Sequence, residues 1–136
     1  MKRVTGLGGV FFKARDPEKL YAWYERHLGL KRRRKQGAVV FGWRDAKSGD
    51  VGMTLWSLFP NYTEYFEPSH APFMLNYRVA DLRALVKTLR AEGIPVAKVR
   101  EYPYGRFAWI MDPEGNRIEL WEPPKTKPKK RSTKRK

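Results

Sequence analysis

Two stretches of this sequence carry its clearest chemistry, and they resemble each other. Both 116-NRIELWE-122 and 51-VGMTLWS-57 alternate like strands and place Leu-Trp at their fifth and sixth positions. Where the later stretch has Glu119, the earlier one has Thr54. A carboxylate that faces a dry cavity can act as a general base, because desolvation raises the pKa of a buried acid, or it can serve as a fixed counter-charge to a cation. Glu119 is therefore the candidate base, and the sequence leaves both roles open.

The same offset of sixty-five residues recurs through the chain. Asp16 aligns with Asp81, and each follows an extended apolar segment and precedes an amphipathic stripe typical of a helix. An aspartate suits the N-cap, since its side chain can accept a backbone N–H of the first turn. Gly29 and Gly93 are placed to end the two helices. Three strand-like runs follow each helix: 30–35, 38–43 and 51–58 in the first half, and 95–102, 106–111 and 116–121 in the second.

The series of one strand, one helix and three strands that contains Glu119 thus occurs twice in the chain. We predict an α+β fold of two tandem βαβββ modules, module one at 5–58 and module two at 73–123, joined by the linker 59–72. A sheet backed by one helix leaves its other face bare, so two such sheets can form an open curved barrel around a shared cavity. At 136 residues the chain has the length of one folding unit, and we predict a single domain over 1–123.

Composition narrows the classes of function. The chain has no cysteine, which excludes disulfides, thiolate metal sites and a cysteine nucleophile. No apolar run approaches the roughly 20 residues that span a bilayer, and no signal-type apolar segment opens the chain. We expect a cytoplasmic protein with no membrane partner.

The net charge of +15 is unevenly distributed. The last fourteen residues hold eight of the 29 Lys and Arg and no acid, which leaves 21 basic against 14 acidic residues in the body. We predict that 124–136 is a disordered basic tail. The tail either binds the phosphates of nucleic acid or another polyanion, or it only aids solubility. The run 31-KRRRK-35 falls on a predicted strand and is interpreted as a solvated edge that discourages edge pairing.

Three segments together resemble a known family. The segments 9-GVFFKARDPEKLYAWYERHLGL-30, Asp81-Leu82 and 112-DPEGNRIELWEP-123 are similar to the vicinal oxygen chelate superfamily, which includes glyoxalase I, extradiol dioxygenases, fosfomycin-resistance transferases and bleomycin-resistance proteins. The resemblance covers residues 5–123. It is specific for the fold but not for the reaction, because one scaffold hosts many chemistries.

The resemblance implies four positions for a metal in the cavity. They correspond here to Gly9, Thr54, Met74 and Glu119, of which only Glu119 is a usual metal ligand. Because zinc or iron needs roughly three or four protein donors, we expect no divalent metal and no other cofactor. Of the two histidines, His27 is placed on the buried stripe of the first helix. The linker residue His70 could reach Glu119 only in an improvised site.

Alternation predicts which side chains share the cavity with Glu119. The opposite face is nearly all apolar and is expected beneath the helices. The cavity residues either bind a ligand or plug the barrel, with Glu119 paired to Lys13 or Arg78. The aromatic linker is expected to seal one cavity mouth or to form a dimer contact. The candidate ligand-binding residues are Phe11, Lys13, Thr54, Trp56, Asn76, Arg78 and Trp121.

Three functions are consistent with these residues. The favoured hypothesis is a metal-independent protein that binds a small aromatic or amphipathic molecule, as bleomycin-resistance proteins bind a drug, and the resemblance implies a homodimer. The second is a lyase, isomerase or dioxygenase-type enzyme that uses Glu119 as a base or metal ligand. The third is a dimeric protein that associates with nucleic acid or another polyanion through its basic tail.

Overall fold

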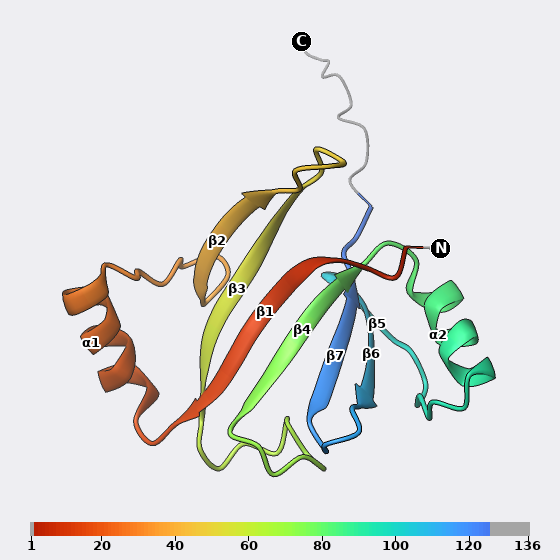
Figure 1. The fold of residues 1–136 in the computed structure, drawn as a ribbon. Helices are drawn as coiled ribbons and strands as arrows, with labels where there is room; N and C mark the ends of the chain where they lie inside the picture. Colours follow the sequence, from red (N-terminus) through yellow and green to blue (C-terminus); the bar gives the residue numbers. More distant parts are fainter. Residues whose placement is uncertain (1, 126–136) are drawn as a thin grey trace.

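A computed structural model gives the fold of residues 2–125 (Figure 1). The prediction of a disordered tail therefore falls almost entirely outside the described residues. No helix among the described residues is long and apolar enough to cross a membrane. The elements in chain order are β1 (Val4–Ala14), α1 (Pro17–Leu28), β2 (Val39–Arg44), β3 (Val51–Pro60), β4 (Phe73–Val79), α2 (Leu82–Ala91), β5 (Arg100–Tyr102), β6 (Gly105–Met111) and β7 (Arg117–Glu122).

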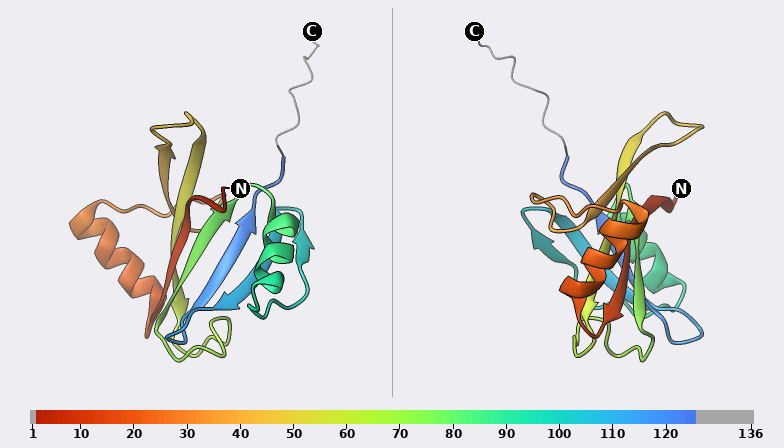
Figure 2. Two further views of the ribbon diagram at one scale, coloured as in Figure 1. Left: turned by 45° about the vertical axis from the view of Figure 1, so that its right-hand side comes forward. Right: turned by 90° about the vertical axis from the view of Figure 1, so that its left-hand side faces the viewer.

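All strands join one mixed sheet in the order β2-β3-β1-β4-β7-β6-β5. The two modules meet where β1 pairs antiparallel with β4. On either side of that junction the arrangement repeats, since β1 pairs parallel with β3 and β4 pairs parallel with β7. The sheet is twisted and open, with α1 at one end and α2 at the other (Figures 1 and 2). The predicted α+β fold of two tandem modules is confirmed.

Module one has one strand fewer than predicted. Residues 30–35 form no strand, and only an isolated bridge joins Arg33 to Ala38. The backbone turns tightly instead, because the Gly37 N–H donates to the Arg33 carbonyl at 2.8 Å. The guanidinium of Arg32 binds both carboxylate oxygens of Glu18 on α1, at 3.0 and 2.7 Å. The basic run is therefore part of a loop held to α1, and its interpretation as a sheet edge was wrong.

The corresponding strand of module two is shortened. We predicted a strand over 95–102, and β5 covers only its last three residues. The Arg90 guanidinium of α2 takes up the carbonyls of Val96 and Ala97, at 3.0 and 3.1 Å. Those carbonyls are then occupied by a side chain, and the segment runs past β6 without pairing along it.

The helices begin where the sequence predicts. The carboxylate of Asp16 accepts the Lys19 N–H at 3.2 Å, and that of Asp81 accepts the Ala84 N–H at 3.1 Å. Gly29 ends α1 in the left-handed conformation, with φ of 70°. This conformation is open to glycine at little cost.

Each helix covers the same face of the sheet. Leu82, Leu85 and Val86 of α2 form a cluster with Val79 and the strands beside it. Tyr77, Ile118 and Leu120 join that cluster, as predicted for the face opposite the cavity. Beneath α1, Tyr21 packs with Ala14 and Leu58 in a smaller cluster. The concave face is thus left to the remaining side chains.

Candidate functional site

The carboxylate of Glu119 lies buried on the concave face, with 2 % of the residue exposed. Its Oε1 accepts the Asn76 side-chain amide at 2.6 Å, and its Oε2 accepts the Trp109 indole N–H at 2.9 Å. The hydroxyl of Tyr65 also donates to Oε2. Three neutral donors therefore surround a buried acid. Hydrogen bonds of this kind compensate part of the cost of taking a carboxylate out of water.

Three neighbouring strands bring this group together. Asn76 on β4 is in register with Glu119 on β7, and Glu119 is in register with Trp109 on β6. Registered residues on adjacent strands point to the same face, so the three side chains lie side by side. The inward orientation predicted for Asn76 and Glu119 is confirmed.

A buried acceptor beside Glu119 has no hydrogen-bond partner within residues 2–125. Asn76 is buried, and its amide points Nδ2 at Glu119, while its Oδ1 accepts no hydrogen bond from the described residues. Gly8 lies next to this oxygen, and a Cβ at that position would come within 2.2 Å of Oδ1. The β1–β4 ladder is irregular between Leu7 and Gly9, which leaves Gly8 outside the regular pairing. An unpaired buried carbonyl is costly, and this oxygen is enclosed against Gly8.

The linker folds over the concave face. Phe66 is fully buried against Phe11 and Met74, and Phe59 packs on the same cluster. The ring of Tyr65 stacks on Phe59, with centroids 5.7 Å apart and planes 4° apart. We call residues 59–70 the cap. Phe59, Tyr65 and Phe66 of the linker therefore pack against the concave face.

Arg117 holds the cap against the sheet. Its Nη1 donates to the Tyr65 carbonyl, and its guanidinium lies 5.0 Å from the Trp109 ring centroid and 5.8 Å from that of Tyr65. Burial lowers the pKa of Arg117. Burial, followed by the negative charge of Glu119, raises the pKa of Tyr65. The phenol therefore remains a neutral donor to the carboxylate.

Other candidate ligand residues border this group without touching Glu119. Lys13 lies with its Nζ 5.7 Å from the Phe66 ring, and Arg78 lies 5.7 Å from the Trp43 ring. Neither forms an ion pair with Glu119 in the part of the chain that the structure describes, so the predicted pairing was wrong. Trp121 donates its indole N–H to the Tyr104 carbonyl at 2.8 Å.

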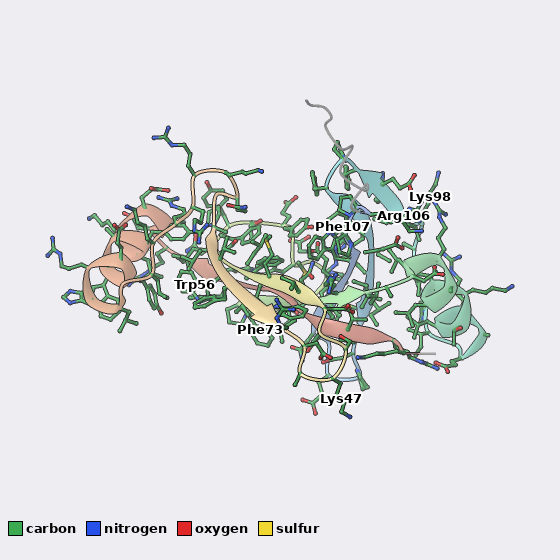
Figure 3. All side chains as sticks on the ribbon, turned by 90° about the horizontal axis from the view of Figure 1, so that it is seen from above. Lys47, Trp56, Phe73, Lys98, Arg106 and Phe107 are labelled. Carbon is green, nitrogen blue, oxygen red and sulfur yellow. The ribbon has the colours of Figure 1, made fainter. Side chains whose placement is uncertain are left out.

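Two predicted cavity residues lie elsewhere. Trp56 packs beneath α1 against Phe12, Tyr21 and Tyr24, with ring centroids 5.3, 6.0 and 4.7 Å away (Figure 3). Thr54 donates its hydroxyl to the Leu7 carbonyl at 2.5 Å. That hydroxyl also accepts the Trp43 indole N–H at 3.0 Å.

The register of the two modules explains both errors. Asn76 pairs with Glu119, whereas Phe11, its counterpart in the repeat, pairs with Ser57. Ser57 is therefore the structural equivalent of Glu119, and the repeat shifts by three residues between Asp16 and the last strand of module one. Because side chains alternate along a strand, an odd shift moves every residue to the other face.

The metal positions offer few ligands, whether the expected Thr54 or its corrected equivalent Ser57 is taken as the fourth. Gly9, Ser57 and Met74 share the face of Glu119 through the strand register, and none of them supplies an imidazole or carboxylate. Within residues 2–125, no group of three or more His, Cys, Asp or Glu side chains could hold a metal ion. His70 is exposed. His27 is exposed against the Trp23 ring, 5.0 Å away, which corrects its predicted burial.

Sequence reasoning missed three residues of the site. Trp109 could have been found from the hairpin around 112-DPEGN-116, since that turn sets Trp109 opposite Glu119. Arg117 lies two residues before Glu119, so strand alternation alone could have placed it on the same face. The position of Tyr65 depends on how the linker folds, and no local pattern in the sequence indicates it.

An open groove adjoins the site. Its volume is about 760 Å³, within the roughly 300–1,000 Å³ typical of ligand pockets. Trp109 and Arg117 form its wall toward Glu119, and Pro68 borders it from the cap. Residues 93–97 form the opposite wall, where the shortened strand passes β6. Trp109, whose indole N–H donates to Glu119, therefore also borders this open groove.

The model of the glyoxalase/bleomycin resistance protein/dioxygenase superfamily matches residues 7–120. The chain belongs to this superfamily. No curated protein sequence matches the chain.

The solved structures that resemble this chain include epimerases. The methylmalonyl-CoA epimerase from Mycobacterium tuberculosis is 24% identical, with a TM-score of 0.56 over 92% of each chain. A variant of the Streptomyces coelicolor methylmalonyl-CoA epimerase, in complex with 2-nitronate-propionyl-CoA, is 16% identical, with a TM-score of 0.65 over 92% of this chain and 99% of that one. At such identities the likeness shows the fold alone.

Proposed function

We propose that this superfamily member binds a small aromatic or amphipathic molecule on its concave face, beside Glu119, without a metal. The observation that carries the proposal is a buried carboxylate next to an unpaired buried amide oxygen, Oδ1 of Asn76, within aromatic walls. A pocket with apolar walls and a few convergent polar groups is the usual form of a small-molecule site.

The polar groups define what the ligand must bring. Glu119 and the Asn76 Oδ1 are both acceptors, so a complementary ligand carries an O–H or N–H donor. The rings of Phe11, Phe59 and Trp109 provide flat apolar surface around these acceptors. A ligand carboxylate would face Glu119 directly, and two like charges in a dry site repel strongly. An uncharged aromatic donor therefore fits best.

Metal independence rests on the donor set. Glu119 is the single carboxylate among the four positions expected to hold a metal, and its two oxygens already accept three hydrogen bonds. One carboxylate with Gly, Ser and Met does not offset the dehydration of a divalent ion. Elemental analysis of protein purified without a metal-binding tag is expected to find less than stoichiometric metal. Stoichiometric zinc, iron or another divalent ion would contradict this part of the proposal.

The decisive experiment titrates the full chain with a panel of small aromatic donors while tryptophan fluorescence is recorded. Trp109 contacts both Glu119 and the groove, so ligand binding should change its emission. Glu119→Gln places an N–H₂ among three donors, and we expect binding to weaken by about tenfold or more, the value of one charge-assisted hydrogen bond. Ser57→Ala is the matched control at the equivalent position and should bind as the wild type does.

The outcomes separate the functions. No fluorescence response to any member of the panel, or equal affinity in Glu119→Gln and the wild type, would contradict the proposal. Mass spectrometry of each ligand after incubation distinguishes binding from catalysis. If the wild type converts a ligand and Glu119→Gln does not, the protein is instead an enzyme that uses Glu119 as its base.

The proposal includes a homodimer. Leu28 of α1 is 60 % exposed and Trp23 is 50 % exposed, although both are large apolar side chains of a helix that should cover the sheet. The outer edge of β2 has no neighbouring strand in the described sheet. Light scattering after gel filtration should give twice the chain mass of 16.0 kDa. A monomer at micromolar concentration would exclude a stable dimer.

A further inference from the structure

Tyr65 occupies the concave site much as a bound phenol would. Its hydroxyl donates to Oε2 of Glu119. Its ring stacks on Phe59 and meets the edge of Trp109, with centroids 6.4 Å apart and planes 86° apart. The Arg117 guanidinium lies over the same ring. Stacking, an edge contact, a cation over the ring and a carboxylate at the hydroxyl are the contacts by which proteins hold a hydroxylated aromatic ring.

The attachment of Tyr65 differs from that of its neighbour. Phe66 is completely buried in the cap's cluster, whereas Tyr65 is 39 % exposed. The backbone N–H of Tyr65 donates only to the nearby Thr63 hydroxyl, at 3.2 Å. The cap is therefore anchored by Phe66 and by the Arg117 hydrogen bond to the Tyr65 carbonyl, and the ring of Tyr65 lies at its rim. Rotation of this one side chain would expose Glu119 without removing the cap.

We infer that the ligand of this site is a phenol, and that Tyr65 is its built-in competitor, which the ligand replaces at Glu119. This inference rests on the proposed function and names its ligand class. The incoming hydroxyl takes over the hydrogen bond to Oε2, and the incoming ring takes over the surface of Phe59 and Trp109. The groove walled by Trp109 and Arg117 borders two of the side chains that contact the Tyr65 ring.

Competition sets the apparent affinity. A ligand that must displace Tyr65 binds only to the fraction of molecules in which Tyr65 has left, so its apparent affinity is lowered by that fraction. Removing the tyrosine ring should therefore tighten phenol binding. Removing the hydroxyl of the ligand should weaken it, because a buried carboxylate oxygen would lose a donor.

The experiment compares p-cresol, p-methylanisole and toluene on the full chain. These probes share a methyl-substituted ring, and only p-cresol has a hydroxyl donor. Binding is measured by calorimetry and by the shift in melting temperature for the wild type, Tyr65→Ala and Tyr62→Ala. Tyr62 is the matched control, since it lies in the same cap and is 83 % exposed.

We expect Tyr65→Ala to bind p-cresol about tenfold or more tightly than the wild type, the factor for one hydrogen bond to a charged group. p-Cresol should also restore part of the melting temperature that this variant loses, and the other two probes should restore little. Tyr62→Ala should match the wild type. If Tyr65→Ala does not fold, Tyr65→Phe keeps the ring, lacks the competing donor and should still bind p-cresol more tightly than the wild type.

Two results would overturn the inference. One is p-cresol binding that is no tighter in the Tyr65 variants than in the wild type, and the other is toluene binding as tightly as p-cresol. If other aromatic donors still bind the wild type through Glu119 in either case, the proposed function stands and only its ligand class fails. If no aromatic molecule binds any variant, both fail.

Discussion

The two modules share one topology but differ in how their helices are held. In module two, Leu82, Leu85 and Val86 are all buried beneath α2. In module one, Tyr21 is the only buried residue of α1. The stripe of α1 is largely aromatic and meets Trp56 by its edges, whereas α2 lays an aliphatic stripe flat on the sheet. Burial of aliphatic surface is the main stabilising contribution, so module two carries more of the stability.

The same asymmetry holds on the concave face. Module two contributes the polar groups Asn76, Trp109 and Glu119, which are linked by hydrogen bonds. Module one contributes Phe11 to the apolar cluster and Ser57 at the position equivalent to Glu119. Duplication therefore supplied two copies of a scaffold, and the hydrogen-bonded group is built on only one of them.

Truncating one residue in each helix is the strongest test of this difference. Leu85 and Leu20 correspond in the repeat, and only Leu85 is buried. We expect Leu85→Ala to lower the free energy of unfolding by about 2–5 kcal/mol, because it leaves a cavity in a packed cluster. Leu20→Ala should cost about 1 kcal/mol or less. Urea denaturation curves measure both, and equal losses would refute the claim that module two carries more of the stability.

Capping provides a second test of intermediate size. The Glu122 carboxylate on β7 accepts the Leu82 N–H at 2.9 Å, so α2 has a cap from the sheet besides Asp81. The first helical residue of α1 is Pro17, which has no N–H to satisfy. Glu122→Ala should cost about 1–3 kcal/mol, because it leaves a buried donor unpaired. Denaturation of Asp16→Ala, which removes an exposed cap, should show about 1 kcal/mol; a larger loss there would reverse the comparison.

The smallest effect concerns alkaline pH. Burial raises the pKa of Tyr65, so its stabilising contribution is complete below the ordinary tyrosine pKa of about 10 and is lost as pH rises further. Stability of the wild type should therefore fall above about pH 10 with a component that Tyr65→Phe lacks. The difference in absorbance titration between the two proteins should have its midpoint above the ordinary value. A midpoint at or below that value would contradict the burial of the phenol beside Glu119.

Much of the fold could be predicted because it depends on local periodicity. The N-caps Asp16 and Asp81 follow from residue type beside an amphipathic stripe, and the two modules follow from the offset of sixty-five residues. The inward orientation of Glu119 follows from the family resemblance combined with strand alternation, and the structure agrees with it. The fate of 30–35 was not predictable in this way. This segment has a strand-like pattern but forms a loop, because Arg32 binds Glu18 on the preceding helix.

The site was predicted less completely because it depends on register and on the linker. Trp56 and Thr54 were assigned to the cavity by a repeat that shifts by three residues within module one, and no sequence pattern marks where the shift occurs. Tyr65 comes from outside both modules. Long-range placement of this kind is set by tertiary packing and not by the pattern of one strand.

The cap connects the two modules covalently and also packs against residues of both. Phe66 is as deeply buried as any residue of the sheet, and Tyr65 is hydrogen-bonded to Glu119, so the connecting segment contributes side chains to the interior although most of its residues are exposed. A chain cut at Tyr62 would have a new end only a few residues from this buried ring. The two halves would then not be separable units that could be expressed apart and mixed, because each would lack the wall that the connecting peptide supplies to both.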